Sequence, residues 1–206
     1  MADELYNPLD KRHLGESVTA ALLKRPVTPL PPPASFNGAG IYALYFHGDS
    51  PAWYAKIAAK NRNEQWAAPI YVGKAVPPGA RKGAYGLDAS PGEVLYRRLR
   101  EYAESILQVE NLSLEDFKCR YLVVDDIWIP LGESLLISMF SPLWNRVLEG
   151  FGNHDPGQGR YNQQRSLWDV VHPGRPWAAK LKPNMRSLEK ILPDIAEFLK
   201  QSATGY

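Results

Sequence analysis

Cysteine is almost absent from the 206-residue chain, in which Cys119 is the only one. A single thiol excludes an intrachain disulfide framework and any zinc site built from several cysteines. Long apolar runs are absent too, since no stretch approaches the roughly 20 apolar residues of a membrane-spanning helix. The N-terminus, Met1 to Glu4, does not show the basic-then-apolar order of a signal peptide. We therefore expect a soluble, cytoplasmic protein whose one thiol lies buried in a strand.

The composition is not extreme in any direction. Hydrophobic residues make up 45% and charged residues 22% of the chain, which excludes a collagen-like or fully disordered protein. The length allows one domain with extensions, or at most two small ones.

Charge of either sign is concentrated in separate segments, although the formal net charge is only +2. Residues 71–100 and residues 144–186 each carry a net charge of +4, and the intervening residues 101–133 carry −6. Two basic segments around an acidic one suit a protein that binds phosphates and keeps a few carboxylates for a metal. Ordinary solvated faces explain the charge pattern equally well.

Three segments rich in aromatic and β-branched residues predict strands at 40–46, 69–73 and 119–124. The first two strands are close enough in the chain to pair as a hairpin with a long connection. Before them, the prolines between positions 26 and 33 force extended backbone, so residues 1–35 are expected to form an N-terminal arm with one or two helical turns at 14–23.

Helix signals follow the second strand. Ser90, Pro91 and Glu93 form a capping box with proline at the first helical position, which predicts a helix to about Leu107. Apolar spacing predicts further helices over about 130–140 and over 188–201, and it places Glu133 in the first turn of the former.

Two short motifs lie on the first two strands, Gly40–Tyr42 and Tyr71–Gly73. An arginine-bearing helix, a glutamate in a later helix and an asparagine follow them in order. Each of these residues taken alone has an ordinary structural explanation, such as a half-buried aromatic or a solvated helix face. The ordered set is similar to the GIY-YIG nuclease superfamily at five positions: Tyr42, Tyr71, Arg98, Glu133 and Asn145.

Longer phrases resemble one branch of that superfamily, the type II restriction endonucleases that recognise CCGCGG. They are residues 38–45, 70–77, 142–145, 150–154 and 168–175. This resemblance runs from about residue 30 to residue 178 and leaves out the arm and the last helix. Where those enzymes carry a histidine one helical turn after the arginine, this chain has Tyr102.

The resemblance implies an α+β fold, with a small three-stranded antiparallel sheet flanked by helices. It divides the chain into the arm (1–35), a nuclease core (36–150) and a C-terminal extension for DNA contact and packing (151–206). It also implies a site-specific deoxyribonuclease that leaves 5′-phosphate and 3′-hydroxyl ends and that works beside a cognate DNA methyltransferase. Because the site is a palindrome and both strands are cut, a homodimer is expected. The arm and residues 53–66 are candidate dimer or DNA-wrapping elements.

The residues themselves suit phosphodiester hydrolysis, which needs a base, a cation on the phosphate and help for the leaving oxygen. Tyr42 and Tyr71 meet if their strands pair, and one phenol can then take or relay a proton; the resemblance favours Tyr42 as the base. A free tyrosine has a pKa of about 10, so a nearby cation is needed, and Lys74 is the candidate. The planar guanidinium of Arg98 can donate hydrogen bonds to the non-bridging phosphate oxygens.

Two further residues complete the expected site. Glu133 is predicted to bind one divalent ion, Mg²⁺, whose other ligands are water and phosphate oxygens. Asn145 has both a donor and an acceptor and could orient a tyrosine or the phosphate.

Recognition of a DNA sequence requires side chains that contact the edges of the bases. Side chains able to contact G·C pairs cluster at 160–165, although a plain polar surface is an equal alternative. The candidate DNA contacts are Arg81, Lys82, Arg97, His154, Arg160, Asn162, Gln163, Gln164 and Arg165. Two other functions stay open: a DNA-binding protein that does not cut, and a repair or junction nuclease.

Overall fold

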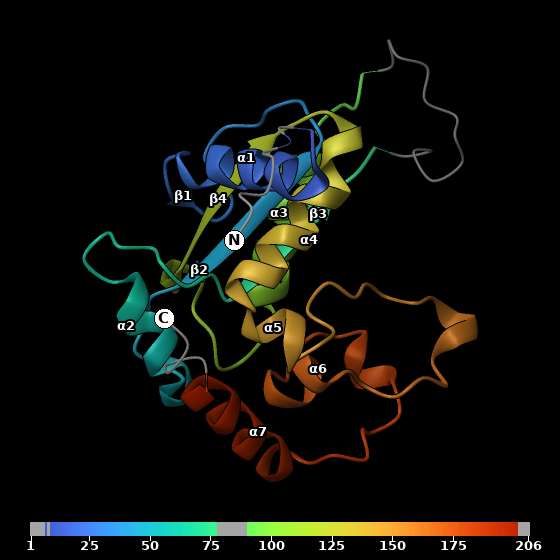
Figure 1. Ribbon diagram of the computed structural model, residues 1–206. Coiled ribbons are helices and arrows are strands. Elements are labelled where there is room, and N and C mark those ends of the chain that lie inside the picture. The colour runs from blue at the N-terminus through green and yellow to red at the C-terminus, as the bar shows by residue number, and fades with distance from the viewer. Residues whose placement is uncertain (1–6, 8, 78–89, 202–206) are drawn as a thin grey trace.

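The computed structural model describes residue 7, residues 9–77 and residues 90–201 (Figure 1). Within them the strands are β1 (Thr28–Pro29), β2 (Gly40–Phe46), β3 (Tyr71–Ala75) and β4 (Phe117–Val123). The α-helices are α1 (Lys11–Leu23), α2 (Ala55–Asn61), α3 (Val94–Leu107), α4 (Ile129–Phe140), α5 (Leu143–Arg146), α6 (Leu167–Val171) and α7 (Leu188–Gln201). Short 3-10 helices are η1 (Ala52–Tyr54), η3 (Leu114–Asp116), η4 (Asp126–Trp128), η5 (Gln158–Arg160) and η6 (Ala178–Lys180). Over these ranges no helix combines the length and apolar character needed to cross a bilayer.

The sheet is antiparallel throughout and has the strand order β1-β4-β2-β3. The predicted hairpin between the first two strands is confirmed, with Tyr42 opposite Gly73. The predicted count of three strands is wrong. Thr28 pairs with Cys119 to add β1 at the edge, and so short a strand, half of it proline, leaves no alternating pattern in the sequence. Cys119 is buried, as expected.

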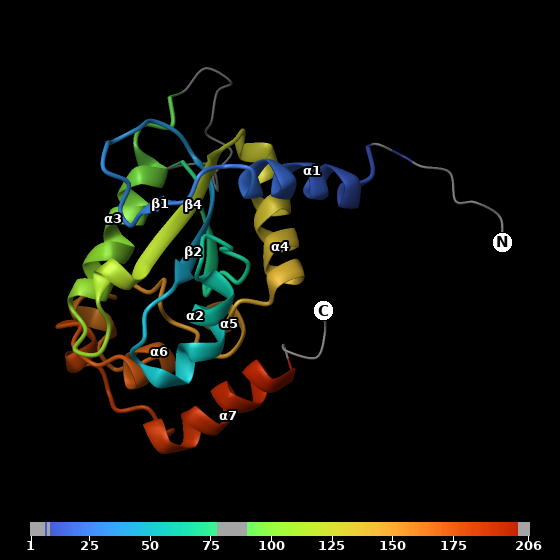
Figure 2. The same ribbon diagram turned by 90° about the vertical axis from the view of Figure 1, so that its left-hand side faces the viewer.

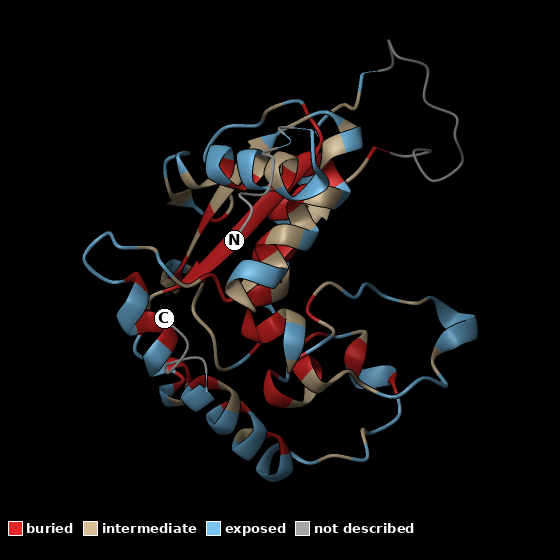
Figure 3. Ribbon diagram, in the orientation of Figure 1, coloured by how far each residue is buried: buried red, intermediate tan, exposed pale blue. Residues whose placement is uncertain are grey.

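Helices cover both faces of the sheet. In Figure 2, α3 lies on one side of β2 and β4, and α4 lies on the other side with α1 next to it. Every residue of β2 is buried (Figure 3), because alternate side chains enter two different hydrophobic clusters. Tyr42, Leu44 and Phe46 pack with α3, whereas Ile41, Ala43 and Tyr45 pack with α4 and α1.

The described part of the expected N-terminal arm packs onto the core. Helix α1 is 13 residues long, where the sequence predicted one or two turns, and Asp10 caps it by accepting a hydrogen bond from the Arg12 amide at 2.8 Å. Leu22 is fully buried. A Cβ at Gly15 would lie 3.1 Å from the Leu135 side chain, so α1 and α4 approach closely at a small residue.

Helix α3 begins later than the capping box predicts. Its first residue is Val94, and Glu93 makes no side-chain cap. Gly92 has φ +60°, a left-handed conformation that a right-handed helix cannot include. The Gly92 carbonyl instead accepts a hydrogen bond from the Gly38 amide at 2.7 Å. The chain ahead of α3 is therefore tied to the segment that leads into β2, a long-range contact that local sequence does not reveal. Ser90 only bonds the Gly92 amide, at 3.4 Å.

The chain after α5 returns to the sheet through aromatic contacts. The Trp144 ring lies 4.5 Å from Phe151 and 5.6 Å from Trp168, and Phe151 stacks on Tyr102 at 4.6 Å. The expected C-terminal extension therefore shares one hydrophobic cluster with the expected nuclease core.

His172 is part of this buried region and is not available to a metal. Its Nε2 lies 2.7 Å from the Tyr54 hydroxyl and its Nδ1 lies 2.8 Å from Oδ1 of Asn111. Since an amide oxygen only accepts, Nδ1 donates and Nε2 accepts from Tyr54. Burial, aided by the charge of Arg175, lowers the pKa of His172 to about 3.

We expect His172 to make stability depend on pH. Its pKa is depressed in the folded state, so between about 6.5 and about 3 the unfolded chain binds a proton that the folded chain does not. The free energy of unfolding should fall in that window as pH falls, by at most about 1.4 kcal/mol per pH unit from this group. Urea unfolding of the wild type and of His172→Gln at several pH values measures the effect; equal pH slopes would contradict it.

Candidate active site

Three tyrosine hydroxyls meet beside the β2–β3 hairpin. Tyr42 comes from β2, Tyr71 from the start of β3 and Tyr102 from α3. The Tyr42 hydroxyl donates to the Tyr102 hydroxyl at 2.8 Å, and the Tyr71 hydroxyl lies 3.3 Å from the same oxygen. The sequence placed Tyr42 and Tyr71 together through strand pairing, but Tyr102 bridges their hydroxyls and so takes the centre of the group.

Two glycines make room for these phenols. A Cβ at Gly73 would lie 2.3 Å from the Tyr42 hydroxyl. A Cβ at Gly152 would lie 2.9 Å from the Tyr71 hydroxyl and 3.3 Å from that of Tyr102. The glycine of the Tyr71–Gly73 motif is therefore required by the tyrosine of the first motif, through the register of the hairpin.

Gly73→Ala should displace the Tyr42 hydroxyl, because the ring is fully buried and has no space to yield. Overpacking of this kind costs about 1–3 kcal/mol of stability, and the hydrogen bond to Tyr102 would be lost as well. We expect a lower melting temperature together with a large loss of activity. Gly159→Ala is the matched control, since a Cβ there meets nothing within 4 Å. Equal melting temperatures and activities for the two variants would contradict this packing.

All three phenols are protonated in this environment. Burial raises the pKa of Tyr42, Tyr71 and Tyr102, while the Arg98 guanidinium lowers each of them by a smaller amount. The Glu133 carboxylate acts in the opposite sense on Tyr71. Both charged groups therefore lie within electrostatic range of Tyr71, which is the least buried of the three residues.

Arg98 lies one helical turn before Tyr102 on α3 and points to a chain segment far away in the sequence. Its Nη1 donates to Nε2 of His154 and lies 3.2 Å from Oε2 of Glu101. Burial, and then the charge of Arg98, lowers the pKa of His154, so its imidazole is a neutral acceptor at neutral pH. About a third of the Arg98 side chain stays exposed (32%).

Lys74 and Glu133 form an ion pair between β3 and α4, with Nζ 2.5 Å from Oε2. Lys74 was expected to be the cation next to the phenols; the structure pairs it with the carboxylate. Glu133 was expected in the first helical turn and is instead the fifth residue of α4, because the helix begins at Ile129. This placement turns it towards β3, the strand that also carries Tyr71.

A divalent ion would find one suitable protein ligand here. The Glu133 side chain is 18% exposed, and a hard carboxylate oxygen that leaves most ligand positions to water and phosphate fits the preference of Mg²⁺. Among the described residues, no group of three or more His, Cys, Asp or Glu side chains is arranged to hold a metal ion. The residues thus fit a loosely held Mg²⁺ and not a tightly held structural metal.

Asn145 supports the site through the backbone of β3. Its Oδ1 accepts from the Val72 amide at 2.9 Å, and its Nδ2 donates to the Val72 carbonyl at 2.8 Å. The expectation was that it orients a tyrosine or the phosphate directly. It instead completes the hydrogen bonding on the outer side of the edge strand, directly after Tyr71.

The candidate DNA contacts have different surroundings. Arg81 and Lys82 lie outside the described residues. Arg97, His154, Arg160, Asn162, Gln163 and Gln164 are exposed. The Arg165 guanidinium donates to the carbonyls of Ala178 and Ala179, at 3.0 and 3.1 Å. These donors therefore bind the chain's own backbone.

Sequence reasoning gave no role to the glycine at 152 or to the buried ion pair between Arg175 and Asp169, at 2.7 Å. One local signal was present. A serine followed three residues later by an acidic residue is typical of a helix start, and Ser166 and Asp169 have this spacing. Ser166 caps α6 by accepting a hydrogen bond from the Asp169 amide.

A family model described as the Eco29kI GIY-YIG domain matches residues 34–199, which is most of the chain. It extends through nearly all of α7, so the resemblance does not stop near residue 178. No curated protein matches. The chain belongs to the Eco29kI GIY-YIG domain family, a family of type II restriction endonucleases.

Proposed function

We propose that this chain is a Mg²⁺-dependent type II restriction endonuclease that hydrolyses one phosphodiester in each strand of its DNA site. One observation carries the proposal: the Tyr71 hydroxyl lies 3.3 Å from that of Tyr102, one helical turn after Arg98, and the strand of Tyr71 also holds Lys74, the partner of Glu133. A base, a cation for the phosphate and a metal ligand are therefore close together, as phosphoryl transfer requires.

Arg98 contacts the non-bridging oxygens of the scissile phosphate. Its Nη1 bonds to His154 in the free protein, and a neutral imidazole is a weaker partner than a phosphate anion. Negative charge on these oxygens grows as the reaction proceeds, so this contact strengthens in the transition state.

Glu133 would hold the metal ion, and a bound Mg²⁺ would supply Lewis-acid stabilisation of the phosphate charge. Lys74 holds the carboxylate in position, with its Nζ 2.5 Å from Oε2.

Tyr71 is the proposed general base that accepts the proton of the attacking water. Tyr71 first releases its own hydroxyl proton to solvent, which positive charge beside the bound phosphate favours. As the oxygen of water bonds to phosphorus and the bond from phosphorus to O3′ breaks, the Tyr71 phenolate takes the proton of the water, and solvent protonates O3′. Tyr71 meets the water because Tyr42 is fully buried and reaches the site only through Tyr102. The cation on the phosphate makes the phenol more acidic, as Arg98 already does in the free protein.

The palindrome CCGCGG is the proposed target, on the strength of the phrases shared with that branch of the superfamily. Reading it on both strands calls for a homodimer with two active sites, and for a methyltransferase that protects the host site. The exposed residues around 160–164 are the proposed base-contacting group.

A supercoiled plasmid with one CCGCGG, incubated with the protein and Mg²⁺, tests the proposal. We expect linear product, none in EDTA, and none from a matched plasmid with the site altered. A non-cleaving DNA-binding protein would shift the plasmid without cutting it, and a junction nuclease would nick it regardless of the site; either result would refute the proposal.

A further inference from the structure

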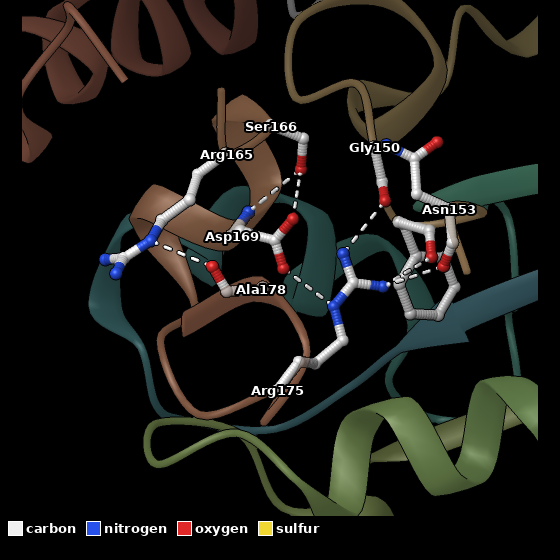
Figure 4. A network of polar contacts seen from close by, with 8 residues as sticks. Gly150, Asn153, Arg165, Ser166, Asp169, Arg175 and Ala178 are labelled. Atoms are coloured by element: carbon white, nitrogen blue, oxygen red, sulfur yellow. Dashed lines mark hydrogen bonds and ion pairs between the residues drawn. The ribbon is translucent and has the colours of Figure 1, made fainter. Parts of the chain in front are cut away.

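Arg175 is a fully buried arginine next to the tyrosine group, with 1% of its surface exposed. Its Nε donates to Oδ1 of Asp169 at 2.7 Å, which neutralises the charge. Its other donors reach three backbone carbonyls, those of Gly150 at 3.0 Å, Phe151 at 3.1 Å and Asn153 at 3.3 Å (Figure 4). A planar group with several donors on one loop fixes the path of that loop.

Two aromatic rings and a hydrogen bond to its carboxylate partner also fix the position of the guanidinium. It stacks between the rings of Trp168 and Trp177, 4.5 and 4.6 Å from their centroids. The second carboxylate oxygen of Asp169 accepts from the Ser166 hydroxyl at 2.6 Å, so the ion pair itself has a fixed orientation (Figure 4). Burial of so many polar atoms is costly unless they are all paired, which they are here.

The loop that Arg175 holds, Gly150–His154, touches three side chains of the candidate active site. Gly152 lies against the hydroxyls of Tyr71 and Tyr102. Phe151 stacks on the Tyr102 ring at 4.6 Å and meets the Tyr71 ring edge-on at 5.1 Å. His154 accepts the hydrogen bond from Arg98.

We propose that Arg175 and Asp169 are positioning residues that set the geometry of Tyr71, Tyr102 and Arg98 through the Gly150–His154 loop. The expected effect on the cutting rate rests on the proposed nuclease function. The expected effect on the position of the loop does not. Neither residue reaches the phosphate, since both side chains are almost wholly buried.

Arg175→Lys keeps the charge and the ion pair with Asp169 but removes most of the donors that hold the carbonyls. We expect the variant to bind the CCGCGG duplex with an unchanged dissociation constant. Its single-turnover cutting rate should fall about 10- to 100-fold, because small displacements of catalytic groups reduce the rate without reducing affinity. The matched control is Arg186→Lys, in which an exposed arginine also bonds an aspartate, Asp194, and a backbone carbonyl.

A second measurement does not need any nuclease activity. Burial, and then the charges of Arg98 and Arg175, lower the pKa of His154, and NMR titration can follow this pKa in each variant. If the loop moves away in Arg175→Lys, this pKa should rise towards its ordinary value, whereas it should not change in Arg186→Lys. If Arg175→Lys does not fold, Ser166→Ala loosens Asp169 more gently and should produce both effects at smaller size.

The outcomes separate the two proposals. A wild type that never cuts refutes the proposed function but not the positioning role, which the His154 titration still tests. A wild type that cuts, with folded variants that show the same cutting rate and the same His154 pKa, overturns the positioning role alone. A loss of affinity equal to the loss of rate would also overturn it, because that pattern indicates a general loss of structure.

Discussion

We expect Glu133→Gln to lower the rate of Mg²⁺-dependent cutting about 10² to 10³-fold and to leave specific DNA binding in place. The amide has almost the same shape but carries no charge, so it binds Mg²⁺ poorly and loses the ion pair with Lys74. Metal stabilisation of a phosphoryl oxygen is worth several kcal/mol, which corresponds to a rate loss of about 10² to 10³. Plasmid cutting and gel shift, performed on the same preparations, measure the two properties.

Glu104→Gln is the control for this variant, because Glu104 is an exposed glutamate on α3 that pairs with Arg100 at 3.3 Å. It should cut at the wild-type rate. If Glu133→Gln also cuts at that rate, Glu133 does not hold the metal and is not part of the active site.

We expect Arg98→Ala to lower the single-turnover cutting rate about 10² to 10³-fold and to weaken DNA binding much less. The loss has the size seen when one donor to a developing negative charge is removed. It arises because the guanidinium contacts the phosphate most strongly when the phosphate carries most charge. The release of His154 and Glu101 from Arg98 changes the free protein little, since both are partly exposed.

Arg100→Ala, two residues further along α3, is the control and should alter the rate by no more than about twofold, as expected of an exposed residue with a surface ion pair. Should Arg98→Ala and Arg100→Ala cut equally well, α3 does not contribute its arginine to the reaction.

Local patterns in the sequence predict much of the fold. The bounds of β2 and α7 and the end of α3 coincide with the predicted ones, because each has a clear apolar period and a clear end signal. Strand β3 begins and ends two residues later than predicted. The seven-residue pairing of β2 with β4 and the pairing of β1 depend on strand partners, which a single segment does not specify.

The candidate site divides in the same way. Pairing of β2 with β3 brings Tyr42 and Tyr71 together, and helical spacing puts Tyr102 one turn after Arg98, so those neighbours follow from sequence. The pairing of Lys74 with Glu133 does not, since it depends on how α4 packs against the sheet.

Long-range contacts account for the remaining residues. Asn145 bonds to Val72, 73 positions away, and Arg98 bonds to His154, 56 positions away. Arg175 reads in the sequence as a surface residue, since arginine is almost never fully buried unless it is paired. Its partner and the carbonyls around it become visible only when the chain is folded.

The most direct test of the central claim is to digest DNA of known sequence with the protein and Mg²⁺ and to read both ends of every fragment. The account predicts breaks in both strands at CCGCGG alone, with ends that bear 5′-phosphate and 3′-hydroxyl and that DNA ligase rejoins. Breaks scattered over unrelated sequences, single-strand nicks only, or DNA that stays intact with a fully folded protein would contradict it.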